Sequence, residues 1–259
     1  MSFFEILITI VGGLFAGILN TLAGNGSAIT LSILTEVLGL PANLANGTNR
    51  LGVFAQGLTG SLTFYKHGKL NIGRSKRIIA LVTIGAIVGV LVAVWVSNEQ
   101  FKSVFRFLML AMLVVILVKP KRWLQDSNPE KELSPFLSVP LFLALGFYGG
   151  FIQMGMGVFF LAVMVLVARY SIIEANAVKI FVVMLYTIFV IAIFQWKGLI
   201  DWRIGLILAS GQAIGGWLAA TFASRFPAAD LWAYRLLVVV VVLALLNMFG
   251  VFEYVFADF

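Results

Sequence analysis

The sequence is poor in charged residues and has no cysteine. Of its 259 residues, 11% are charged and 61% are hydrophobic, and the mean hydropathy is +1.05. Soluble domains are typically about one-quarter charged, so this composition excludes a water-soluble surface and predicts an integral membrane protein. The lack of cysteine also excludes disulfides, thiolate catalysis and cysteine-based metal sites.

Groups that could carry out catalysis are equally scarce. The single histidine, His67, lies in a polar loop, where we expect a solvated side chain rather than a ligand. The sequence shows no nucleophile–base pair and no metal cluster, so we expect neither an enzyme nor a cofactor. The net charge of +7 does not predict nucleic-acid binding, because the basic residues gather in short loops between apolar runs, as in the positive-inside pattern.

Apolar segments account for most of the chain and predict an all-α fold with about 8–10 transmembrane helices. The first segment lacks a basic leader and a cleavage site, so we interpret it as a retained span. A membrane-crossing helix needs about 20 residues, and two segments have only 13. The ten segments are 3–23, 28–40, 43–65, 77–97, 101–118, 135–153, 157–169, 174–196, 203–222 and 231–252.

The two halves of the sequence resemble each other. "FYKHGKLN" (64–71) aligns with "FQWKGLID" (194–201) at an offset of 130 residues, which superposes Phe64 on Phe194. "GLFAGILNTLAGNG" (13–26) similarly resembles "GFYGGFIQMGMG" (146–157). We therefore predict two tandem repeats of five segments each. Their expected boundaries are 1–118 and 135–259, with an exposed polar linker at 119–134.

The orientation of the repeats depends on the two short segments. If each half crosses the membrane five times, the repeats are inverted; if the short segments dip in and return, each half crosses four times and the repeats are parallel. Basic residues in the loops 66–77 and 119–134 place both loops on the cytoplasmic side. The remaining loops hold too few basic residues to decide between the two arrangements.

A glycine-rich patch precedes each short segment, at 24–27 and at 155–157. A broken helix in lipid exposes backbone groups, which must be satisfied by protein or by water in a cavity. The start of a helix also carries partial positive charge. Interrupted segments at corresponding positions of two repeats indicate the binding site of a transporter. Close helix packing alone would explain the neighbouring glycines, but not the Asn and Ser residues in the first patch.

Two basic residues lie inside apolar segments. Arg50 and Lys179 are one position apart in the repeat frame. A Lys or Arg at the membrane centre costs roughly 2.5–3.5 kcal/mol on insertion scales and usually faces a cavity or a partner. We expect both cations to approach one electropositive site from opposite halves; snorkelling toward the headgroups is the alternative.

These motifs resemble the TauE/SafE family of membrane transporters, also called the sulfite exporter family. The resemblance rests on "GLFAGILNTLAGNGSAITL", "LPANLANGTNRL" and "GFYGGFIQMGMGVFF" followed by "ANAVKI", and it extends over essentially the whole chain. It implies two repeated halves and the movement of small anions, often sulfite or organosulfur compounds, across a bacterial inner membrane. The family's first patch is often a run of three glycines, which Asn25 and Ser27 interrupt here.

The expected function is secondary transport, with export as the expected direction, of a small anion such as sulfite or a sulfonate. An anion channel and a transporter of a small carboxylate remain alternatives. Expected partners are the anion and the lipid bilayer, with no nucleic acid, and a homodimer is one open assembly state. The residues expected to bind substrate are Asn20, Gly24, Asn25, Gly26, Ser27, Asn46, Thr48, Asn49, Arg50, Gln153, Gly155, Gly157, Asn176 and Lys179.

Overall fold

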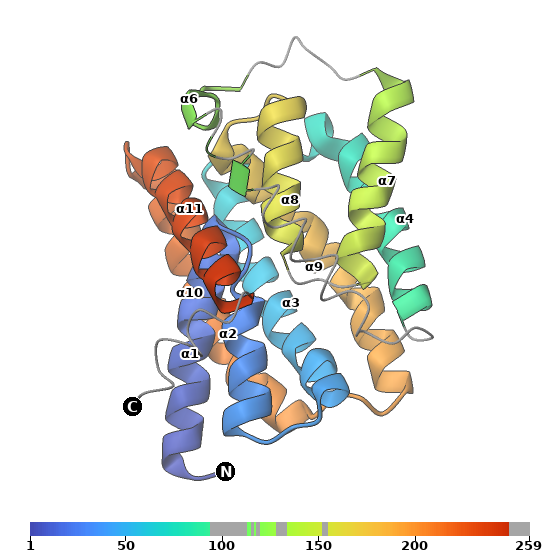
Figure 1. Cartoon of the computed structure of the whole chain (residues 1–259), viewed down its shortest axis with the longest axis vertical. Helices are drawn as coiled ribbons and strands as arrows, with labels where there is room; N and C mark the ends of the chain where they lie inside the picture. The colour runs from blue at the N-terminus through green and yellow to red at the C-terminus, as the bar shows by residue number, and fades with distance from the viewer. Residues whose placement is uncertain (94–112, 115–116, 118–119, 128–133, 152–154, 249–259) are drawn as a thin grey trace.

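The computed structural model describes residues 1–93, 113–114, 117, 120–127, 134–151 and 155–248. Within these residues the chain is helical and has no strands (Figure 1). The helices are α1 (Phe3–Leu22), α2 (Ser27–Ser32), η1 (Ile33–Val37), α3 (Ala42–Lys66), α4 (Ile72–Ala93), α6 (Pro120–Trp123), α7 (Pro135–Phe151), α8 (Met156–Ala162), η2 (Val163–Val167), α9 (Ile172–Trp196), α10 (Trp202–Arg225) and α11 (Ala229–Met248).

Five of these helices are long and apolar enough to cross a membrane: α1, α4, α9, α10 and α11. This confirms the predicted all-α integral membrane fold. Helix α3 is as long as α9, with 25 residues, but it is much less apolar. The reason is that polar side chains such as Asn46, Asn49 and Gln56 interrupt its apolar sequence. A long helix of this kind must turn its polar groups toward protein or a cavity rather than lipid.

The helix boundaries recur at the offset that the sequence comparison indicated. Helices α3 and α9 begin 130 residues apart, as do α4 and α10. The caps correspond too: the Asn71 side chain accepts a hydrogen bond from the Arg74 amide at 3.0 Å, and Asp201 accepts one from Ile204 at 2.9 Å. These caps start α4 and α10 early, so most of the basic loop expected at 66–77 belongs to helices.

Glycines set the pairing of helices across the two halves. A Cβ on Gly13 or Gly17 would meet the backbone of α10, at Leu208 and Gln212 respectively. In the same way, Gly146 and Gly150 on α7 face the backbone of α4. In each pair of helices, the residue numbers of the contacting residues increase together, which requires the two helices to be parallel. Helix α1 therefore runs parallel to α10, and α7 runs parallel to α4. Small residues permit this close approach of backbones in membranes.

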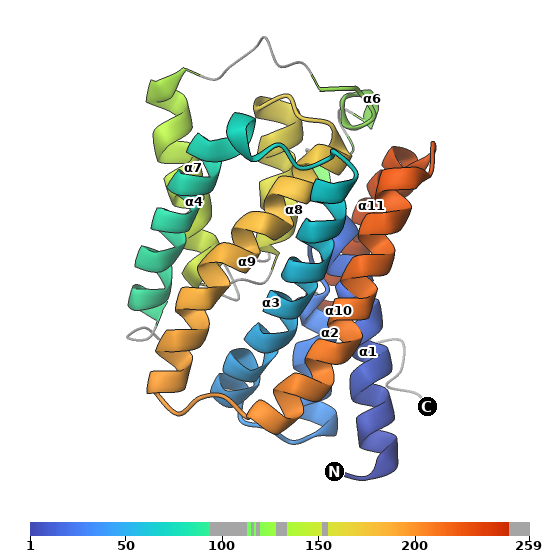
Figure 2. The ribbon, with the colours of Figure 1, turned by 180° about the vertical axis from the view of Figure 1, so that it is seen from behind.

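Helices α3 and α9 cross near their middles and run in opposite directions (Figure 2). The connection after α9 meets the start of α3, where Leu199 O faces Gly47. At the other end, Ser75 at the start of α4 pairs with Tyr170, just before α9, at 3.2 Å. Corresponding helices of the two halves therefore point in opposite directions, and the repeats are inverted.

The short helices return toward the end from which the preceding helix came. In Figure 1, α2 and η1 together run from the middle of the bundle to its lower end, and α8 and η2 together run from the middle to its upper end. The short segments thus dip into the bundle and return, and the repeats are nevertheless inverted. The expectation that returning segments would require parallel repeats was wrong. The reason is that α1 also ends in the middle, so that α1 and α2 form a hairpin with both ends on one side.

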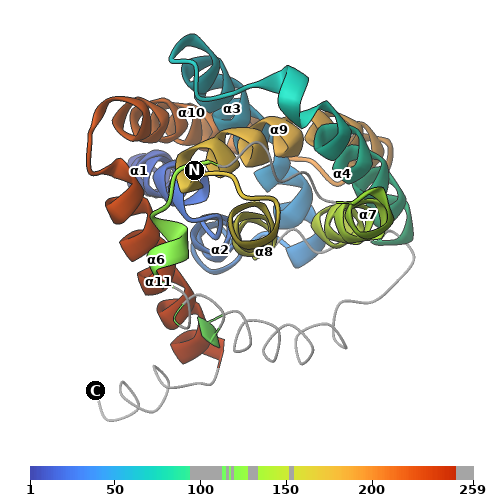
Figure 3. The same cartoon turned by 90° about the horizontal axis from the view of Figure 1, so that it is seen from above.

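Viewed from above, α1 and α10 lie on one side of the bundle, and α4 and α7 lie on the other (Figure 3). The linker is less exposed than expected. Trp123 is completely buried and packs against Tyr234 of α11, with ring centroids 6.1 Å apart. The hydroxyl of Ser127 accepts a hydrogen bond from the Ser171 amide at 2.9 Å. The expected boundaries of the repeats remain a prediction, since residues 118 and 119 lie outside the described part of the chain.

Most of the described basic residues lie at the end of the bundle that carries the linker and the α3–α4 connection. Arg225, at the end of α10, belongs to this group because its Nε lies 3.2 Å from His67 Nε2. Only Lys197 and Arg203, among the described residues, lie near the opposite end. The basic residues at the linker end are Lys66, Lys69, Arg74, Lys76, Arg77, Lys121, Arg122, Arg169, Arg225 and Arg235.

Candidate functional site

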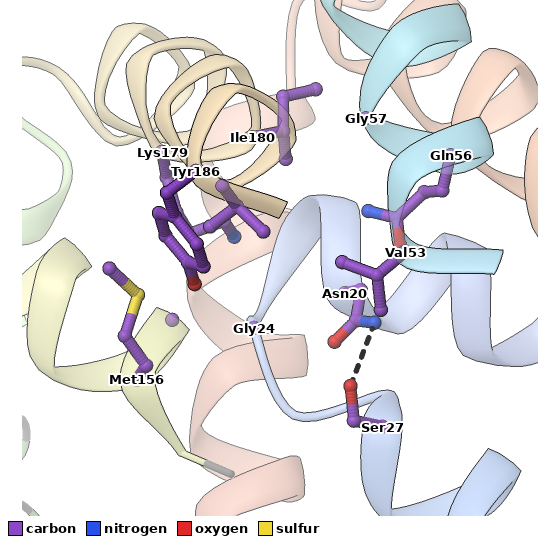
Figure 4. Close-up of a pocket in the computed structure, with 12 residues that line it drawn as sticks. Asn20, Gly24, Ser27, Val53, Gln56, Gly57, Met156, Lys179, Ile180 and Tyr186 are labelled. Atoms are coloured by element: carbon purple, nitrogen blue, oxygen red, sulfur yellow. Dashed lines mark hydrogen bonds between the residues drawn. The ribbon is translucent and has the colours of Figure 1, made fainter. Parts of the chain in front are cut away.

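A cavity of about 40 Å³ lies where the two broken helices meet the crossing of α3 and α9 (Figure 4). It has room for roughly three water molecules. Its residues come from both halves: Asn20, Gly24, Ser27, Val53, Gln56, Gly57, Met156, Gly157, Lys179, Ile180, Val183 and Tyr186. Five of them, Asn20, Gly24, Ser27, Gly157 and Lys179, were predicted from the sequence.

The cavity lies halfway along the two crossing helices. Val53 and Gln56 are the twelfth and fifteenth residues of α3, and Val183 and Tyr186 hold the same places in α9. Residues three apart lie on one face of a helix, so each helix turns the same face toward the cavity. The site is thus at the depth where substrates bind in transporters built from inverted repeats.

The two glycine patches touch each other beside the cavity. Gly24 has a φ of +91°, a backbone conformation that favours glycine, and a Cβ on it would lie 2.5 Å from Cα of Gly157. A Cβ on Gly157 would likewise meet Cα of Gly24. Gly155 starts α8 with a φ of +73°. The two glycine patches, which correspond in the repeats, are therefore in direct backbone contact. A side chain on either glycine would push them apart.

Asn20 organises the first patch. Its Oδ1 accepts a hydrogen bond from the Gly26 amide at 2.7 Å, which satisfies a free donor at the start of α2. Its Nδ2 lies 3.5 Å from Ser27 Oγ, the dashed contact in Figure 4. Neither Asn25 nor Gly26 lines the cavity, although Asn25 is buried and its Oδ1 has no hydrogen-bond partner among the described residues.

Lys179 brings a positive charge from the second half to the broken helix of the first half. Its side chain is 2% exposed, and its Nζ donates hydrogen bonds to Thr21 O at 3.2 Å and to Asn176 Oδ1 at 2.5 Å. Asn176 in turn donates to Leu22 O at 3.0 Å. These bonds satisfy carbonyls at the end of α1, where a cation is also favoured by the helix dipole. An ammonium group has three donors, so one remains for a ligand in the cavity.

Gln56 and Tyr186 are cavity residues that were not predicted from the sequence. Gln56 donates through Nε2 to Thr21 Oγ1 at 3.2 Å, whereas its Oε1 has no partner within the described part of the chain. The buried Tyr186 hydroxyl has no hydrogen-bond partner among the described residues and points into the cavity (Figure 4). The two residues are 130 positions apart, so the repeat offset applied to polar residues inside apolar segments could have found them.

Arg50 is buried but does not line the cavity. It is 1% exposed, and its Nε and Nη1 have no hydrogen-bond partner in the described structure. Its guanidinium lies 5.8 Å from the centroid of the Phe194 ring. The structure therefore rules out snorkelling for Arg50, since its charged group lies inside the protein rather than at a headgroup.

The polar neighbours of Arg50 hold helices together. Asn49 Oδ1 accepts hydrogen bonds from Thr30 at 2.7 Å and from Gln212 at 3.3 Å, which joins α3 to α2 and α10. Thr48 Oγ1 accepts a hydrogen bond from the Asp201 amide at 2.9 Å. Asn46 is half-buried and outside the cavity. Gln153, also predicted to bind substrate, lies outside the described residues.

The cavity offers hydrogen-bond donors and one positive charge. No acidic side chain is among the described residues that line it, and the described residues contain no group of three or more His, Cys, Asp or Glu side chains that could hold a metal ion. Lys179, Tyr186 and Ser27 supply N–H or O–H donors, which suit a small anion.

Similar proteins are named as membrane transporters. The chain is 26% identical to the probable membrane transporter protein ORF9 of a Sinorhizobium species, with 86% of this chain and 85% of that protein covered. It is 29% identical to a probable membrane transporter protein of Haemophilus influenzae, with 80% of this chain and 81% of that protein covered. It is 24% identical to the probable membrane transporter protein YfcA of Escherichia coli K12, over 83% and 81%. With the broken helices and the mid-depth cavity, these relatives define a multi-pass membrane transporter.

The family is also established. The sequence model of the sulfite exporter TauE/SafE family matches residues 9–248, nearly the whole chain. The chain therefore belongs to this family, as its glycine patches and repeats indicated. No solved structure matches it.

Proposed function

We propose that this transporter moves a small anion, sulfite or a sulfonate, across a bacterial inner membrane without chemically altering it. The observation that carries the proposal is the Lys179 ammonium, fully buried beside a cavity whose described lining includes no acid. A buried cation with no acidic partner among the described residues favours an anion as its ligand. The family match supports a sulfur oxyanion as that partner.

The position of the cavity between the two inverted halves favours transport over an open channel. About 40 Å³ suits an anion the size of sulfite, and a larger sulfonate would require the lining to move apart. The inverted halves meet around the cavity, so movement of one half against the other would expose it to the two sides in turn.

We infer the orientation from the distribution of basic residues. Ten described Lys and Arg residues lie at the linker end and two near the other end. Short cytoplasmic loops carry an excess of Lys and Arg, so the linker end would face the cytoplasm. For an exporter, the anion would then enter from that end.

Anion binding by the purified protein tests the proposal. Isothermal titration would compare sulfite, sulfoacetate, taurine, sulfate, acetate and chloride, with Lys179→Met beside the wild type. We expect saturable binding of a sulfur oxyanion or sulfonate, and loss of that binding in Lys179→Met. The control is Lys197→Met, because Lys197 is an exposed lysine far from the cavity.

Tyr186→Phe separates binding from stability. The hydroxyl has no partner among the described residues, so its removal should leave the unfolding temperature unchanged or slightly higher. A hydrogen bond to a charged group contributes about 1.5–3 kcal/mol, so anion affinity should fall by roughly 10-fold to 100-fold. If both Lys179→Met and Tyr186→Phe bind the anion with wild-type affinity, the anion binds elsewhere and the proposed site is refuted.

A further inference from the structure

The two buried cations lie at different depths. Gly57 of α3 faces Ile180 and Met184 of α9, which sets the level at which the helices cross. Arg50 is seven residues from Gly57 toward the α9–α10 end, whereas Lys179 lies on the linker side of that level. Counted along the helix axes at 1.5 Å per residue, the Cα atoms of the two cations are at most about 15 Å apart in depth.

The side chains also point away from each other. Helical side chains lean toward the start of their own helix, and α3 and α9 start at opposite ends of the bundle. Arg50 accordingly lies beside Phe194, near the end of α9, while Lys179 reaches the end of α1 at Thr21 O. One small anion could not contact both groups in this conformation.

Arg50 lacks the partners that Lys179 has. Lys179 donates to two oxygen acceptors, whereas two of the three guanidinium nitrogens of Arg50 are buried without an acceptor in the part of the chain that the structure describes. No Asp or Glu among the described residues forms an ion pair with it. An arginine keeps its charge when buried, and a guanidinium binds the oxygens of a carboxylate or phosphate in a fork. A sulfur oxyanion has oxygens of the same kind.

The connection between α9 and α10 covers the turn of α3 that carries Arg50. Leu199 O packs against Gly47, and the Asp201 amide donates to Thr48 Oγ1 at 2.9 Å. Together with Phe194, these contacts surround the turn of α3 that carries Arg50.

We propose that Arg50 is a second anion-binding station, which opens when the α9–α10 connection moves away from α3 and which receives the anion from the Lys179 cavity during transport. The inference rests on the proposed function, since it requires that the cavity bind an anion. It assigns the two cations to opposite conformations of the transporter instead of to one shared site.

Binding and transport by Arg50→Gln distinguish two stations from one. We expect Arg50→Gln to bind sulfoacetate or sulfite within about threefold of the wild type, because the Lys179 cavity is intact, but to transport it in liposomes at least 100-fold more slowly. Lys179→Met should lose both activities. The proposal is overturned if Arg50→Gln binds as weakly as Lys179→Met, which indicates one site, or if it transports at the wild-type rate. Wild-type protein that binds no anion would instead refute the proposed function, and the second station with it.

Thiol labelling tests the route to Arg50 without any ligand and without substituting Arg50. The chain has no cysteine, so Asn46→Cys places a single thiol one helical turn from Arg50 toward the end opposite the linker. An impermeant maleimide added on that side should label it, and Thr48→Val, which removes the contact to Asp201, should raise the rate at least fivefold. Gln125→Cys in the linker is the control and should react only from the linker side. Failure to label Asn46→Cys in both backgrounds would overturn the proposal.

Discussion

The contact between Gly24 and Gly157 allows a quantitative test of how the two halves meet. Gly24 combines a φ of +91° with a contact to Gly157, whereas Gly157 has the contact without a positive φ. Gly39 has a φ of +66° and open space around the position of a Cβ. Alanine substitutions at these three glycines therefore separate the effect of backbone conformation from the effect of the contact.

The expected losses of unfolding free energy follow from these two effects. A left-handed backbone conformation costs an L-residue roughly 1–2 kcal/mol, and overpacking a tight site typically costs about 1–3 kcal/mol. Gly39→Ala should therefore destabilise by about 1–2 kcal/mol and Gly157→Ala by about 1–3 kcal/mol. Gly24→Ala combines both effects and should destabilise by about 2–5 kcal/mol.

Unfolding by SDS titration in mixed micelles, followed by circular dichroism, measures all three variants. Anion titration of the same preparations adds a functional measurement: Gly157→Ala should weaken binding, because the cavity wall shifts, and Gly39→Ala should bind as the wild type does. If Gly24→Ala is no less stable than Gly39→Ala, the two patches do not touch, and the reasoning about the site is wrong.

Two further predictions concern packing away from the cavity. Gly150→Ala places a Cβ against the backbone of α4 and should destabilise the protein by about 1–3 kcal/mol in the same assay. Gly73→Ala, in the exposed first turn of α4, should stabilise it by about 0.5–1 kcal/mol. Equal effects of the two substitutions would argue against the α4–α7 contact. Trp123→Ala should release the linker from α11 and raise its cleavage rate by trypsin at least tenfold, while Trp232→Ala, which is 54% exposed, should change it little. Unchanged cleavage of Trp123→Ala would contradict the buried position of that tryptophan.

Helix positions followed closely from hydropathy and from the repeat. Segment 43–65 became α3 (Ala42–Lys66), and segment 174–196 became α9 (Ile172–Trp196). Long apolar runs have little freedom in a bilayer, because every backbone group must be satisfied within the helix. The larger error fell at α4, which starts at Ile72 instead of 77 because the Asn71 cap extends a helix through basic residues.

The relation between Arg50 and Lys179 could not be predicted in the same way. The sequence showed that they are one position apart in the repeat frame, but inverted repeats place them at opposite depths, whereas parallel repeats would place them at the same depth. The orientation depended on where α1 ends, and Gly24 marks a break without showing which way the chain turns. The contacts of Leu199 with Gly47 and of Ser75 with Tyr170 settled the direction, and no local pattern encodes those contacts.

The site exists only because each half completes the other. The end of α1 in the first half is held by Lys179 and Asn176 of the second half, and Gly24 of the first half rests on Gly157 of the second. Movement of one half against the other must therefore change the contacts that shape the cavity, so access and binding are linked. Lys179 consequently supports the fold as well as the charge of the site, and its substitution will affect stability and binding together. Tyr186, whose hydroxyl has no partner among the described residues, lacks this second role, so a loss of affinity in Tyr186→Phe at unchanged stability identifies the anion site more directly than any change at Lys179.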